Sequence, residues 1–158
     1  FLKHLDPEHM EVYCPLSYGD GAVREQVLKA GEAALGAAFR PLTEFMDKRD
    51  YIEFLAGMDV GIFYNDRQQA MGNVNMLLSL GKKVFLRPGT SMWENYISQG
   101  YALYPADSIA AMTMEELLEY PGADRERNLR LRDGLDRVED ARKAWSAVLA
   151  DSAGITER

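Results

Sequence analysis

Short apolar runs alternate along the chain with longer segments in which apolar residues recur at helical spacing. The clearest run covers residues 59–64, and a polar loop follows it directly. Runs at residues 12–16, 39–42, 83–87 and 102–104 predict four further strands. Because a helical segment separates each strand from the next, the order indicates βαβ units and a parallel sheet. We therefore expect an α/β protein with a Rossmann-like parallel sheet and helices on both faces.

The ends of several helices are also visible in the pattern. A helix is expected from Ala22 to a stop at Gly36, and Asp47 is a candidate N-cap for the next helix. Two more helices are predicted at residues 68–80 and 91–99. These signals are local, so they predict elements and not their arrangement in space.

The chain becomes wholly helical after Pro105, and we expect a long C-terminal helical segment over residues 106–150. An apolar stripe follows one face of the helix expected at residues 124–150: Leu131, Leu135, Val138, Trp145 and Leu149. The other faces of this helix are densely charged, which is typical of an amphipathic helix docked on a domain. We predict a single domain over residues 1–158.

Composition narrows the class of protein. The 158 residues suit one domain with a sizeable core. A formal charge of −7 argues against a nucleic-acid-binding module, which usually has a basic balance. The single cysteine excludes an internal disulfide framework, and with only two histidines a structural zinc site is not expected. No apolar run reaches the length of about 18 residues that would predict a membrane span.

Ligands of such sheets bind at the carboxyl ends of the strands, so the loops there are the expected place for ligand-binding residues. The loop at residues 17–21 lies between the first strand and its helix, where N-terminal amides suit a phosphate. Its Gly19 and Gly21 begin a dinucleotide-binding pattern that fails at the third glycine, because position 24 is Arg24. A tight turn between strand and helix is an equally good interpretation of this loop.

The loop at residues 65–73 follows the clearest strand and carries more chemistry. Arg67 offers a forked set of donors to a phosphate. Gln68 and Gln69 can bind hydroxyl and amide groups through donor and acceptor atoms, and Gly72 lets a ligand approach the backbone. The pattern favours a sugar phosphate as ligand. The alternative is a capped helix start with a solvated first turn.

Five motifs occur in the order and spacing of a known family: Pro15-Leu16-Ser17-Tyr18-Gly19, Phe45-Met46 followed by Tyr51, Asp59-Val60-Gly61-Ile62-Phe63, Arg67-Gln68-Gln69-Ala70-Met71-Gly72-Asn73, and Gly81-Lys82-Lys83-Val84. On these motifs, residues 11–105 resemble the TDP-N-acetylfucosamine:lipid II N-acetylfucosaminyltransferases, also called 4-alpha-L-fucosyltransferases. Those bacterial enzymes extend the lipid-linked saccharide of enterobacterial common antigen, a cell-envelope polysaccharide.

The resemblance implies a particular place in a larger enzyme. Family members have the two-domain GT-B glycosyltransferase architecture, and the similarity falls in the C-terminal, donor-binding half. The chain is thus expected to be a nucleotide-sugar-binding fragment of a hexosyltransferase, inactive alone. The lipid-linked acceptor would bind through the other half. The intact protein would lie in the cytoplasm, peripheral on the inner face of the cytoplasmic membrane.

The resemblance also implies roles for the two loops and for a third segment. Residues 17–19 would lie near the donor diphosphate, residues 42–44 near the nucleoside, and residues 67–69 with Asn73 beside the diphosphate and sugar. Adding Asn65 and Gly72 of the second loop gives the predicted donor site: Ser17, Tyr18, Gly19, Leu42, Thr43, Glu44, Asn65, Arg67, Gln68, Gln69, Gly72 and Asn73.

The implied reaction moves a sugar from a nucleotide diphosphate to a hydroxyl of the acceptor. Arg67 and helix N-terminal amides would stabilise the leaving diphosphate. No paired carboxylates or D-x-D motif occur at the loops, so we expect no metal and no other cofactor; no catalytic base is identified. Two alternatives stay open, an NAD-type Rossmann module and an α/β interaction domain without a small ligand.

Overall fold

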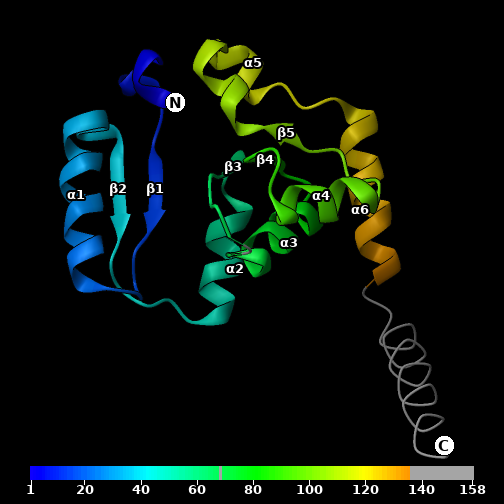
Figure 1. Ribbon diagram of the computed structural model, residues 1–158, viewed down its shortest axis with the longest axis horizontal. Helices are drawn as coiled ribbons and strands as arrows, with labels where there is room; N and C mark the ends of the chain where they lie inside the picture. Colours follow the sequence, from blue (N-terminus) through cyan, green and yellow to red (C-terminus); the bar gives the residue numbers. More distant parts are fainter. Residues whose placement is uncertain (68, 136–158) are drawn as a thin grey trace, which may run out of the picture.

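The structure, a computed structural model, describes residues 1–67 and 69–135 (Figure 1). Its strands are β1 (Val12–Pro15), β2 (Phe39–Leu42), β3 (Val60–Phe63), β4 (Lys83–Leu86) and β5 (Tyr104–Pro105). Its α-helices are α1 (Gly21–Leu35), α2 (Lys48–Ala56), α3 (Met71–Ser79), α4 (Ser91–Ser98), α5 (Met114–Leu118) and α6 (Gly122–Leu135). Short 3₁₀ helices are η1 (Leu2–His4), η2 (Pro7–His9), η3 (Gly36–Ala38) and η4 (Ala106–Ala111). Gln68 and the predicted helix and stripe beyond residue 135 lie outside the described residues.

The α/β class and the parallel strands are as predicted, but the strands form two sheets instead of one. β1 pairs with β2, and a second sheet has the order β3-β4-β5. Within the described residues no ladder joins β1 to β3. Pro15 and Pro41 lack amide hydrogens, which suits a small sheet with open edges. Side chains connect the sheets instead, since the rings of Tyr13 on β1 and Phe54 on α2 pack edge to face at 5.1 Å.

Most predicted helix ends are confirmed. Asp47 caps α2 by accepting hydrogen bonds from the first-turn amides, and Gly36 ends α1 with a φ of 52°. The third helix is an exception, because it begins at Met71 and not at residue 68. Ala70 adopts the left-handed conformation, with a φ of 57°, so a right-handed helix cannot continue back through it. The last strand also begins later than predicted, at Tyr104.

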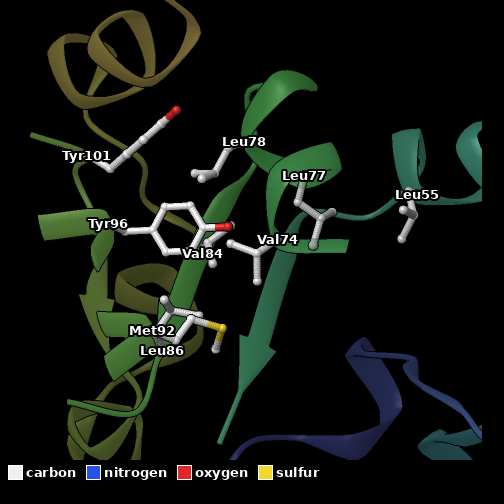
Figure 2. Close-up of a cluster of buried hydrophobic side chains, with 9 residues drawn as sticks. All are labelled: Leu55, Val74, Leu77, Leu78, Val84, Leu86, Met92, Tyr96 and Tyr101. Carbon is white, nitrogen blue, oxygen red and sulfur yellow. The ribbon is translucent and has the colours of Figure 1, made fainter. Parts of the chain in front are cut away.

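The second sheet carries the hydrophobic core on both of its faces. Successive residues of β4 point to opposite sides, so Val84 and Leu86 face α3 and α4 while Phe85 faces η1, η4 and α5. Figure 2 shows the first cluster, in which Tyr96 lies beside the valines of α3 and β4. The first sheet has a thinner cover, because α1 packs along it (Figure 1) but buries no residue fully. In the part of the chain that the structure describes, helices thus cover both faces of the second sheet.

Hydrogen bonds from polar side chains hold α6 against the core. The fully buried Asn128 accepts a hydrogen bond from the Ala102 amide and donates to the Ala102 carbonyl and to the Tyr120 hydroxyl. Arg132 donates to the Ser79 hydroxyl of α3 at 2.9 Å. These contacts hold α6 against α3 and the chain leading into β5. In the described stretches, no helix is both long and apolar enough to cross a membrane.

Candidate functional site

The first and third predicted segments meet at the carboxyl ends of β1 and β2. The parallel register sets Pro15 opposite Leu42, and the Leu16 amide extends the ladder by donating to the Leu42 carbonyl at 2.8 Å. Ser17 and Leu42 are half-buried just beyond this point, whereas the neighbouring side chains are exposed: Tyr18, Thr43 and Glu44. The sheet thus brings residues 17–19 and 42–44 together.

The N-terminus of α1 differs from the expected phosphate site. Gly19 has a φ of 112°, a backbone conformation that favours glycine, and it turns the chain so that Asp20 caps the helix. The Asp20 carboxylate accepts from the amides of Ala22 at 2.8 Å and Val23 at 3.1 Å. A carboxylate therefore already occupies two of the amides that a phosphate would need. The turn between strand and helix was the better interpretation of the Gly19 and Gly21 pattern.

Tyr51 of α2 lies near residues of both the first loop and the third helix, and the sequence analysis named it in a family motif without assigning it a role in the donor site. Burial raises the pKa of Tyr51, and the neighbouring phenol of Tyr18 raises it further, whereas Asn73 lowers it. Two of the predicted donor residues, from separate loops, thus influence the pKa of one phenol.

The other residues of the second loop present their side chains to solvent. Arg67 and Gln69 are exposed, Asn65 is half-buried, and Gln68 lies outside the described residues. Arg67 forms no hydrogen bond or ion pair with any residue that the structure describes. A Cβ on the exposed Gly72 would meet no atom within 4 Å, so the protein's own packing does not require glycine there. Open space beside the backbone is compatible with the ligand approach predicted for Gly72.

The N-terminus of α3 is less satisfied than that of α1. The N-cap position is Ala70, whose side chain cannot accept a hydrogen bond, and its carbonyl accepts from the amides of Asn73 and Val74. No described side chain accepts from the amides of Met71 or Gly72. Amides of this kind at a helix start attract anions, because the helix dipole places positive charge there. As far as the described side chains go, the first amides of α3 thus have no acceptor, unlike those of α1.

A cationic group missed by the sequence analysis lies beside the second loop. Arg87 directly follows β4, forms an ion pair with Asp66, and stacks over the Tyr64 ring with its guanidinium carbon 4.9 Å from the centroid. The Tyr64 hydroxyl donates to Asp107 at 2.6 Å, and this hydrogen bond raises the pKa of Tyr64. The available signal was an arginine at the carboxyl end of the strand predicted at residues 83–87.

The surface of α2 has a hollow of about 340 Å³ that includes none of the predicted donor residues. It is lined by Lys48, Arg49, Ile52 and Glu53. Among the described residues, no group of three or more His, Cys, Asp or Glu side chains could hold a metal ion.

Protein-family models and solved structures were compared with the chain, and neither comparison finds a match.

Proposed function

We propose that the chain binds a nucleotide diphosphate sugar at the carboxyl ends of its strands and is the donor-binding part of a GT-B-type glycosyltransferase. The resemblance of the motifs makes TDP-N-acetylfucosamine the expected donor and a lipid-linked saccharide the expected acceptor. The observation that carries the proposal is the uncapped start of α3, which opens directly from the loop that contains Arg67. Free amides and an exposed guanidinium are together suited to a diphosphate.

The neighbouring segments support the same ligand. Residues 17–19 and 42–44 share one edge at the ends of β1 and β2, where the exposed ring of Tyr18 offers a stacking surface for a base or sugar. Tyr18 at this edge and Asn73 on α3 both influence the pKa of Tyr51. A ligand that reaches from this edge to the start of α3 would need a base or sugar at one end and an anion at the other. A nucleotide has both of these parts.

The reaction step that these residues would assist is departure of the nucleoside diphosphate. The bond between the sugar anomeric carbon and the diphosphate oxygen breaks, the acceptor hydroxyl forms the new bond, and negative charge develops on the leaving oxygen. The amides of Met71 and Gly72 and the Arg67 guanidinium would stabilise that charge without a metal ion. The base that accepts the hydroxyl proton would come from the acceptor-binding half, as would contact with the membrane.

Titration of the isotope-labelled chain with TDP tests the proposal. Amide signals of residues 17–19 and 69–73 should shift together in the millimolar range or below, with the same dissociation constant in the presence of magnesium or EDTA. Thymidine should shift the first group more than the second, because it lacks the diphosphate. A stronger response to NAD than to TDP would favour a dinucleotide-binding module. No response to either at millimolar concentration would contradict a nucleotide site.

A further inference from the structure

The ion pair between Arg87 and Asp66 lies at the carboxyl ends of β3 and β4, two neighbouring strands of the second sheet. The Arg87 amide donates to the Phe63 carbonyl at 3.0 Å, which extends the β3-β4 ladder by one residue. The Thr90 hydroxyl donates to the Arg87 carbonyl at 3.0 Å. The backbone of Arg87 is thus fixed on both sides by hydrogen bonds, whereas Asp66 lies in the loop that follows β3.

The guanidinium of Arg87 is oriented before any ligand arrives. It lies over the Tyr64 ring, and that ring is anchored by its own hydrogen bond to Asp107. Stacking on an aromatic ring leaves the donor edge of a guanidinium free to bind an anion in its plane. Arg67 has no such support among the described residues, so binding through it would require a flexible side chain to be ordered first.

The carboxylate that pairs with Arg87 is weakly held. The Asp66 side chain is 77% exposed and that of Arg87 is 38% exposed. Ion pairs with this exposure contribute little, because water and salt screen them. A diphosphate carries more charge than a carboxylate and can accept from both arms of the guanidinium fork, so it can replace Asp66 at small cost.

We propose that Arg87 is a second guanidinium that binds the diphosphate, in addition to Arg67, and that Asp66 occupies its donors in the free protein and is displaced by the ligand. The inference rests on the proposed function, because it names a residue that would hold the charged part of that ligand. Asp66 then acts as a competitor that lowers affinity for the anion. It also keeps Arg87 aligned at the strand end while the site is empty.

Two substitutions with opposite expected effects test the exchange in the complete chain. Arg87→Gln should weaken TDP binding by about tenfold, because charge-assisted hydrogen bonds are lost. Asp66→Asn should strengthen TDP binding by about two- to fivefold, because the competing charge is removed. Thymidine affinity should change little in either variant. Arg87→Lys should fall between the wild type and Arg87→Gln, because charge is kept and the fork is lost.

The exposed pair Arg49 and Glu53 on α2 provides matched controls, since its side chains are 87% and 66% exposed. Arg49→Gln and Glu53→Gln change the net charge as the test variants do and should leave the TDP dissociation constant unchanged. Thermal unfolding of each variant confirms that it folds.

The outcomes separate the two proposals. If the wild type does not bind TDP, the proposed function fails. If it binds and Arg87→Gln binds equally well, the assignment of Arg87 is wrong while the nucleotide site stands. Weaker binding by Asp66→Asn would overturn the displacement, because it would make Asp66 part of the bound site.

Discussion

Replacement of Asn128 by alanine should reveal how firmly α6 is attached to the core. The side chain is fully buried, and its amide makes three hydrogen bonds, two with the backbone of Ala102 and one with the Tyr120 hydroxyl, all between 2.8 and 2.9 Å. Each contributes about 1 kcal/mol, and loss of Asn128 leaves buried partners unsatisfied. We expect Asn128→Ala to lower the free energy of unfolding by about 3 kcal/mol. For a domain of this size, that corresponds to roughly 6–12 °C in Tm.

Urea and thermal denaturation of matched variants measure this effect. Asn128→Leu keeps most of the side-chain volume, so a loss similar to that of Asn128→Ala would assign the effect to hydrogen bonds and not to a cavity. Gln99→Ala is the control, because it removes an exposed amide with one hydrogen bond to the Asn95 carbonyl, and it should change stability by less than about 0.5 kcal/mol. If Asn128→Ala behaved like Gln99→Ala, the docking of α6 described above would be wrong.

Three further changes test local features by the same measurements. A Cβ at Gly31 would overlap the ring of Phe39, so Gly31→Ala should destabilise the protein by about 1–2 kcal/mol, although alanine has the better helix propensity. A Cβ at Gly21 would meet no atom within 4 Å, so Gly21→Ala is the control and should not destabilise the protein. Ala70→Gly should stabilise by roughly 1 kcal/mol, because it relieves the left-handed backbone; a loss of stability would refute that conformation. Hydrogen bonds from first-turn amides lower the pKa of Asp47 below its value in the unfolded chain, so its contribution is present above about pH 4 and lost as pH falls through the folded-state pKa. The stability difference between wild type and Asp47→Ala should therefore shrink on acidification, and a constant difference would contradict the capping charge.

Local sequence signals predicted the elements well, because their causes are local. The Asp47 cap and the stop at Gly36 depend on residues within one helical turn, and both are present. The start of α3 was predicted too early, because helical periodicity contains no information about the left-handed backbone of Ala70. The division into two sheets was also missed, since strand pairing depends on distant segments and not on the apolar runs themselves.

The sequence indicated which loops form the candidate site, but not which side chains of different elements lie next to one another there. The strand ends indicated the loop of Tyr18, and the family resemblance indicated Asn73, but neither signal showed that both residues influence the pKa of Tyr51. Likewise, the order of residues could not show that Arg87 stacks on the ring of Tyr64 and pairs across the strand ends. Such partners are set by the tertiary arrangement, so they appear only when the strands are side by side.

TDP titration of the labelled chain shows whether the strand ends form one nucleotide site. If they do, the amide signals of residues 17–19 and 69–73 will shift with a single dissociation constant, and Arg87→Gln will raise this constant by about tenfold. Unchanged signals at millimolar TDP, or shifts confined to other parts of the chain, would contradict a single nucleotide site.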